Sequence, residues 1–184
     1  MIHKLTPEEM NRLSLNAFHK SRKLPLTVVL DNVRSQNNIG SVFRTADAFR
    51  IEHIALCGIC STPPHREIHK TALGAEESVA WSYHENTGAC VRQLKGQGYS
   101  VYAVEQVSDS IKLDTLGADN SLPGNKIAII LGNEIEGVQD EVLRLCDGSL
   151  EIPQFGTKHS LNVSCAAAIV IWEMFKQLKV KSYE

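Results

Sequence analysis

The chain has 184 residues, of which 43% are apolar and 22% are charged, and its formal net charge is −2. This size and composition are typical of one compact globular domain with a core of its own. A net charge so close to zero argues against a protein that depends on a large basic field to hold nucleic acid, while it leaves room for a local basic patch.

The sequence shows no sign of a membrane span or of export. No run of about 18 apolar residues is present, and the N-terminal segment is polar throughout, unlike a signal peptide. The five cysteines are an odd number without a secretion signal, which argues against a disulfide framework. We therefore expect a cytoplasmic protein that has no membrane partner.

The first predicted element is a helix over residues 6–20. Thr6 can cap it, Pro7 suits its first position, and Glu9 can close a capping box with Thr6. Basic residues gather at the end of this helix and again further along the chain: Lys20, Arg22 and Lys23, then His65, Arg66, His69 and Lys70. Either group can form a local basic patch.

Beyond this helix, strands and helices alternate. Short apolar runs predict strands at 25–33, 51–58, 78–83, 99–106, 126–133 and 149–153. Helices are predicted at 38–50, 63–74, 87–98, 139–147 and 162–179, with a loop at 117–125. This alternation predicts an α/β fold with a mainly parallel sheet flanked by helices. Since no repeat, low-complexity tract or linker interrupts the chain, we expect one domain over residues 1–184.

Ligands of open parallel sheets bind outside the carboxyl ends of the strands, and three predicted strand ends are rich in glycine and polar residues. The first is followed by NNIGSVFRTADAF. Asn37 or Asn38 can cap the helix there. Gly40 and Arg44 share one helical face, which Gly40 leaves open because it has no side chain. Arg44 is then either a site residue or an exposed arginine paired with Asp47.

The second junction carries LGNEIEGV. Gly132 follows an apolar strand and Gly137 precedes a helix, and backbone can approach a ligand closely at such glycines. Glu134 and Glu136 lie between them, either as site residues or as solvated carboxylates of an ordinary turn. The G-x-G-x-x-G fingerprint and the Walker loop pattern are both missing, so neither type of nucleotide site is predicted.

The third junction carries EIPQFGTKHSLNVSCAAA. Ser160 and Asn162 stand where the last helix begins, and they either cap it or belong to a binding loop. The spacing does not match a phosphate-binding loop. Apolar residues of this helix recur at helical spacing and are expected to face the core: Val163, Ala167, Val170, Met174 and Leu178.

In this order and on this α/β background, the three junctions resemble the three sequence motifs of the SpoU/TrmH family of RNA 2′-O-ribose methyltransferases, in the SPOUT superfamily. The resemblance covers residues from about 30 to 175. It implies a SPOUT-type domain with a trefoil knot near its C-terminus, which cradles S-adenosyl-L-methionine. It also implies a homodimer whose RNA site is built from both subunits, with part of the last helix facing the partner.

Residue by residue, the resemblance assigns the catalytic site to Arg44, Asn38, Glu134, Ser160 and Asn162. It assigns the cofactor contacts to Leu131, Gly132, Ile152, Gln154 and Leu161. The methyl acceptor is a ribose 2′-hydroxyl, whose proton must leave during in-line transfer. Because arginine holds its proton to a pKa above about 12, we expect Arg44 to hold the RNA phosphate and to stabilise the developing alkoxide, with Glu134 or water as the base.

The sequence says less about which RNA is the substrate. Only about 22 residues precede the first strand, which favours the compact, tRNA-directed type over relatives whose extra N-terminal domain accompanies activity on ribosomal RNA. We expect tRNA, with ribosomal RNA as the alternative. A non-catalytic RNA-binding module of the same fold would keep the basic clusters and lose the cofactor pocket, and the intact motifs argue against it.

The segment CGIC, at residues 57–60, is a C-x-x-C directly after a strand, the pattern of a redox pair or of half a zinc site. His65 and His69 follow at helical spacing. In a zinc finger, about 12 residues separate the two ligand pairs, whereas only four residues separate Cys60 from His65. We therefore expect structural cysteines and no metal site.

Overall fold

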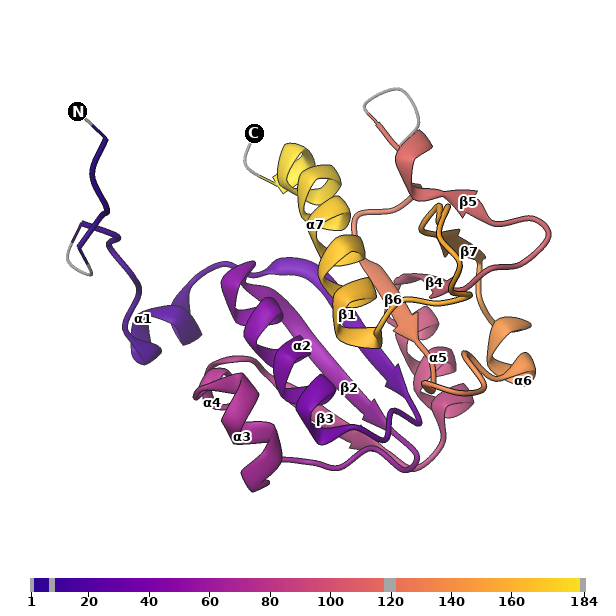
Figure 1. The fold of residues 1–184 in the computed structure, drawn as a ribbon, viewed down its shortest axis with the longest axis horizontal. Coiled ribbons are helices and arrows are strands. Elements are labelled where there is room, and N and C mark those ends of the chain that lie inside the picture. The colour runs from indigo at the N-terminus through magenta and orange to yellow at the C-terminus, as the bar shows by residue number, and fades with distance from the viewer. Residues whose placement is uncertain (1, 7–8, 118–121, 183–184) are drawn as a thin grey trace.

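The computed structural model describes residues 2–6, 9–117 and 122–182. Within these residues, seven strands form one sheet in the order β3-β2-β1-β6-β4-β7-β5, and every neighbouring pair is parallel (Figure 1). The strands are β1 (Leu24–Asp31), β2 (Ile51–Cys57), β3 (Trp81–His84), β4 (Ser100–Val104), β5 (Ile111–Lys112), β6 (Ile127–Leu131) and β7 (Gly148–Glu151). The predicted α/β fold with a mainly parallel sheet is confirmed.

Helices cover both faces of the sheet (Figure 1). They are α1 (Leu15–Lys20), α2 (Gln36–Ala48), α3 (Arg66–Ala72), α4 (Ala75–Ser78), α5 (Thr87–Gly96), α6 (Asp140–Leu143) and α7 (Val163–Ser182), with the 3₁₀ turn η1 (Leu113–Thr115). One hydrophobic cluster joins the sheet to α2, α3 and α7, and a second joins its other face to α5 and α6. β6 is buried along its whole length because both of its faces are covered, which explains its continuous apolar run.

The N-terminal helix begins later than predicted. Thr6 and Glu9 do form the reciprocal bonds of a capping box, with the Thr6 N–H 2.7 Å from the Glu9 carboxylate. Only a turn follows, because Asn11 takes a positive φ of 48°. α1 instead begins after Ser14, whose hydroxyl caps it, so the predicted start at Thr6 is wrong. Pro7 lies outside the described residues.

The second helix begins earlier than predicted. Its cap is Ser35, whose hydroxyl accepts the Asn38 N–H at 3.3 Å. Asn37 and Asn38 were the predicted caps, and both lie inside α2 instead. A serine two residues upstream therefore satisfies the free N–H groups of the first turn.

Gly40 is not the open position that the sequence suggested. A Cβ added to it would lie 2.2 Å from the Ile68 carbonyl oxygen and 2.2 Å from the Thr71 hydroxyl, both in α3. The missing side chain therefore lets α2 and α3 touch, and the predicted open surface is wrong.

Three short elements are absent from the sequence prediction. β5, η1 and α4 span two to four residues each, too few for a periodic pattern. The last helix, by contrast, buries most of its predicted apolar face: Ala167, Val170, Met174 and Leu178. Residues 118–121 of the predicted loop at 117–125 lie outside the described residues. No helix in the described ranges is long and apolar enough to cross a membrane.

We expect Gly40→Ala to lower the free energy of unfolding by about 1–3 kcal/mol, because the added methyl group must push α3 away from α2. Thermal unfolding measures this change as a lower Tm. Gly96→Ala is the matched control: no atom lies within 4 Å of a Cβ at this position in α5, so alanine should be neutral or stabilising there. Equal Tm values for Gly40→Ala and the wild type would show that α3 yields without loss of stability.

Candidate active site

A pocket of about 740 Å³ opens at the carboxyl ends of β4, β6 and β7. Its volume lies in the range of small-molecule sites, about 300–1,000 Å³. The strand order explains its position, since β6 lies between β1 and β4 and β7 follows β4. The walls come mainly from four chain segments, 104–107, 131–138, 150–152 and 159–163, together with Ala166 of α7.

The loop after β6 is folded back on itself. Asn133 and Gly137 exchange two backbone hydrogen bonds, at 3.0 and 2.9 Å. A Cβ on Gly132 would lie 2.0 Å from the Gly137 carbonyl carbon, and Gly137 itself has a φ of +70°. Both glycines are therefore required by the packing of the loop. This conformation places the Glu134 side chain within reach of the start of α2.

The Glu134 carboxylate holds the start of α2. It accepts the backbone N–H groups of Arg34 and Ser35, each at 3.1 Å, and the Asn38 side-chain amide at 3.2 Å. Partial burial alone would raise the pKa of Glu134, but these donors and its own N–H outweigh burial and hold the pKa below its usual range. An ionised carboxylate at a helix N-terminus also interacts favourably with the helix dipole.

A second amide extends this contact into the third junction. Asn162 Nδ2 donates to Asn38 Oδ1 at 3.1 Å. Asn162 Oδ1 accepts the Ser164 N–H at 2.9 Å and so caps α7. A polar chain Glu134–Asn38–Asn162 thus joins the three junctions that the sequence singled out. Ser160 lies in the exposed loop before the cap, so the helix start belongs to Asn162 and not to Ser160.

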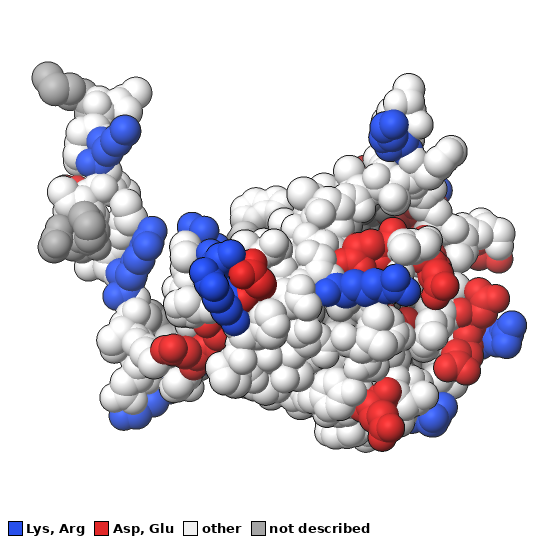
Figure 2. All heavy atoms as spheres, turned by 60° about the horizontal axis from the view of Figure 1, so that its bottom comes forward, with Lys and Arg blue, Asp and Glu red and all other residues white. Residues whose placement is uncertain are grey.

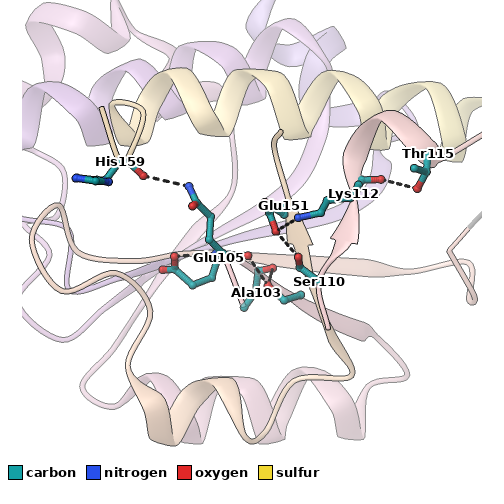
Figure 3. Close-up of polar contacts among 9 residues, drawn as sticks. Ala103, Glu105, Ser110, Lys112, Thr115, Glu151 and His159 are labelled. Atoms are coloured by element: carbon teal, nitrogen blue, oxygen red, sulfur yellow. Dashed lines mark hydrogen bonds and ion pairs between the residues drawn. The ribbon is translucent and has the colours of Figure 1, made fainter. Parts of the chain in front are cut away.

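Residues at the end of β4 hold two loops of the pocket, the one after β6 and the one before α7. The sequence prediction missed this role. Glu105 accepts the Val138 N–H at 3.2 Å with one carboxylate oxygen and the Gln106 N–H at 3.0 Å with the other. The Gln106 side-chain amide donates to the His159 carbonyl at 3.1 Å (Figure 3). A signal was present, because the strand predicted at 99–106 ends in two polar residues, Glu105 and Gln106.

One edge of the pocket is held by an ion pair between neighbouring strands. Glu151 of β7 contacts the Lys112 ammonium of β5 and accepts the Ser110 hydroxyl (Figure 3). Lys112 and Ser110 hold the pKa of Glu151 below its usual range. The short strand β5 is thus attached to the sheet through a side chain as well as through its backbone.

Eight of the ten predicted site residues line the pocket: Glu134, Ser160, Asn162, Leu131, Gly132, Ile152, Gln154 and Leu161. Asn38 is not in the lining, but it contacts two residues that are. Arg44 is not in the lining either, and it is exposed on α2 about two turns beyond the helix start. Asp47, the acidic partner considered for Arg44, accepts the Ser78 hydroxyl.

Basic and acidic side chains are interspersed on the face shown in Figure 2, where no continuous basic field is seen among the residues drawn in colour. At the end of α1, Lys20 and Arg22 are exposed. Lys23 turns back onto its own chain, and its ammonium donates to the Phe18 and Ser21 carbonyls. A basic contact surface on this face is therefore local, as the near-neutral net charge predicts.

The C-x-x-C residues point in different directions. Cys57 and Cys60 are buried in different hydrophobic clusters, Cys57 on the α5 side of the sheet and Cys60 on the α2 side. Burial raises the pKa of Cys60 to about 11, and its thiol donates to a backbone carbonyl at 3.3 Å. His65 caps α3, and His69 pairs with Glu76. Within the described ranges, no group of three His, Cys, Asp or Glu side chains is placed to hold a metal ion.

Comparison with known proteins identifies the family. The model of the SpoU rRNA Methylase family matches residues 25–172. The tRNA (guanosine(18)-2′-O)-methyltransferase of Thermus thermophilus is 33% identical over 178 residues, which are 96% of this chain and 88% of that enzyme. The enzyme of the same name from Escherichia coli is 30% identical over 85% of this chain and 65% of its own length.

Two solved structures share the fold. An RNA methyltransferase of the TrmH family from Porphyromonas gingivalis is 30% identical, with a TM-score of 0.70 over 81% of this chain and 58% of that one. An rRNA methyltransferase from Sinorhizobium meliloti, solved with AdoMet bound, is 27% identical, with a TM-score of 0.75 over 85% of this chain and 58% of that one. The chain thus spans less than two thirds of these two proteins. Because the family model and the Thermus thermophilus enzyme match most of its length, the chain belongs to the SpoU/TrmH family of RNA 2′-O-ribose methyltransferases.

Proposed function

We propose that this protein transfers a methyl group from S-adenosyl-L-methionine to a ribose 2′-hydroxyl of RNA, and that the RNA is tRNA. One observation carries the proposal: the polar chain Glu134–Asn38–Asn162 brings the three family motifs together at the edge of a ligand-sized pocket. The name of the Thermus thermophilus relative supports tRNA as the substrate. The pocket itself argues against a non-catalytic RNA-binding module.

The lining of the pocket suits this cofactor. When bound, S-adenosyl-L-methionine supplies a methyl group on a positively charged sulfonium. The residues that would hold it combine apolar side chains with a glycine and one amide: Leu131, Gly132, Ile152, Gln154 and Leu161. The carboxylates of Glu105 and Glu151 also line the pocket, and negative groups suit a cationic ligand.

Glu134 is better suited to position other groups than to accept a proton. Its carboxylate already accepts three donors, and its lowered pKa makes protonation unfavourable. A guanidinium is a permanent donor, so Arg44 holds the RNA phosphate and stabilises the developing alkoxide. Water is then the proton acceptor, and Ser160 and Asn162 orient the reacting groups.

The exposed position of Arg44 supports a homodimer. Two aromatic residues of α7 form a cluster with Phe49, which directly follows α2: Trp172 lies 5.7 Å from Phe49 and 5.7 Å from Phe175 between ring centroids. Trp172 is 50% exposed and Ile169 is 41% exposed. We infer that a second copy covers this apolar face and brings Arg44 to the pocket of its partner. The trefoil knot and the cytoplasmic location stay predictions.

Arg44→Ala should lower methyl transfer by at least about 100-fold, because a donor to the developing charge is lost. Binding of S-adenosyl-L-methionine should stay nearly unchanged, since Arg44 does not line the pocket. Transfer of a labelled methyl group to tRNA measures the first effect and calorimetry the second. Arg92→Ala, which removes an exposed arginine of α5, is the control.

Two results would count against these roles. Normal turnover by Arg44→Ala would remove Arg44 from the reaction. A wild-type protein that binds no S-adenosyl-L-methionine at millimolar concentration would contradict the proposed function and favour the RNA-binding module.

Trp172→Glu should convert the dimer to a monomer, because it places a charge in the covered apolar face. Sedimentation velocity measures the change, and methyl transfer should fall with it if Arg44 serves the partner's pocket. Ile59→Glu, at a 59% exposed apolar residue of the loop after β2, is the control. A wild-type protein that is monomeric at concentrations where it is active would contradict the homodimer.

Glu134→Gln should lower stability at neutral pH and have less effect in acid. The folded-state pKa of Glu134 is lowered, so its ionised form stabilises the fold above the usual glutamate pKa of about 4.3. This contribution is lost as the pH falls through the folded-state value. Thermal unfolding of both proteins from about pH 3 to about pH 7 tests this, with Glu136→Gln in the same loop as the control. A Tm difference that persists in acid would contradict the ionic role.

A further inference from the structure

A second pocket, of about 520 Å³, lies at the other end of the sheet, beside β3. It is lined by the loop segment 63–66, by His69 of α3, by Glu76 and Glu77 of α4 and by Trp81 of β3. Figure 1 shows α3 and α4 together at this end, away from β7. None of these residues belongs to the polar chain or to the lining of the candidate active site.

Glu76 carries an unsatisfied acceptor in this pocket. Its side chain is only 10% exposed, and one carboxylate oxygen contacts the His69 ring nitrogen at 2.5 Å. The other oxygen, Oε2, is buried without a hydrogen-bond partner, and it is the only such side-chain atom in the part of the chain that the structure describes. Buried polar atoms are nearly always hydrogen-bonded, so Oε2 is an acceptor that is still available to a donor from a ligand.

The charge of Glu76 restricts what that ligand presents. Burial raises the pKa of Glu76, but the contact with His69 and nearby backbone N–H groups outweigh burial and hold the pKa below its usual range. The group is therefore an anion that only accepts hydrogen bonds. A ligand atom beside Oε2 must carry a hydrogen, and a phosphate oxygen is repelled from this position.

Trp81 and the rim supply the other two parts of the site. Trp81 is half-buried and packs against the main hydrophobic cluster, which holds its ring in place. Arg66 is exposed where the loop enters α3. α1 lies alongside, because its His19 ring contacts the Glu77 carbonyl at 3.0 Å, but it contributes no residue to the lining. The pocket thus combines a fixed aromatic ring and a buried acceptor with a rim that carries one guanidinium, Arg66, and one exposed carboxylate, Glu77.

We propose that this pocket binds one unpaired nucleotide of the RNA substrate. The base stacks on Trp81, its exocyclic amino group donates to Glu76 Oε2, and its phosphate contacts Arg66 at the rim. This inference rests on the proposed function in that its ligand is RNA. Three strand spacings, about 15 Å, separate β3 from β6, so the bound nucleotide is not the one that is methylated.

The first test measures nucleotide binding without methyl transfer. The chain has two tryptophans, so in a Trp172→Phe background only Trp81 emits. CMP should quench this emission in a saturable way, and UMP, which lacks an exocyclic amino group, should bind more weakly. Arg66→Ala should weaken the binding of CMP and leave that of cytidine unchanged, because only CMP carries the phosphate.

The matched pair of variants is on α4. Glu76→Gln should weaken CMP binding by at least about tenfold, since a charged acceptor is lost. Glu77→Gln makes the same change at an exposed neighbour and should leave binding unchanged. In the methyl-transfer assay, Glu76→Gln should raise the KM for tRNA while kcat and cofactor affinity stay the same. Trp81→Leu should also raise the KM for tRNA without changing kcat or cofactor affinity. The Tm of each variant shows whether it is folded.

Trp81 emission that does not respond to millimolar CMP would overturn the proposal, as would equal effects of Glu76→Gln and Glu77→Gln. If Glu76→Gln does not fold, an unchanged KM for tRNA in Trp81→Leu overturns it as well. A protein that binds CMP through Glu76 but methylates no RNA would keep this site and contradict the proposed function alone.

Discussion

The candidate site depends above all on the Glu134 carboxylate at the start of α2. It accepts N–H groups 99 and 100 positions away in the sequence, and Asn38 links it to Asn162, a further contact across 124 positions. Residues 134–136 of the loop after β6 are exposed, so hydrogen bonds help to set the position of this part of the loop. A charged acceptor makes such bonds about twice as strong as neutral ones.

The sheet order makes this contact possible. β6 lies between β1 and β4, so loops that are far apart in the sequence leave the sheet side by side. Asp31, fully buried at the end of β1, fixes the same edge by accepting the Thr87 hydroxyl at 2.5 Å and the Gln139 N–H at 3.2 Å. Three carboxylates therefore hold the loop after β6: Glu134 near its start, and Glu105 and Asp31 at its end.

The predictions succeeded where a local pattern decides the structure. β6 is a buried strand and therefore a continuous apolar run, and α7 has an apolar face at helical spacing. They failed where a distant partner decides. Gly40 makes room for a helix whose position no local pattern gives. The start of α1 was missed for a local reason: Thr6 forms its capping box, yet the backbone at Asn11 ends the turn. Glu105 was missed because only the order of β4 and β6 shows which loop it holds.

The polar chain Glu134–Asn38–Asn162 also determines when, during folding, the candidate site is complete. Contacts between segments this far apart form only after the intervening chain has closed, because the entropy of loop closure opposes them until then. A nascent chain that ends before residue 162 has no Asn162 to complete the set. The assembled site is therefore a marker of completed folding.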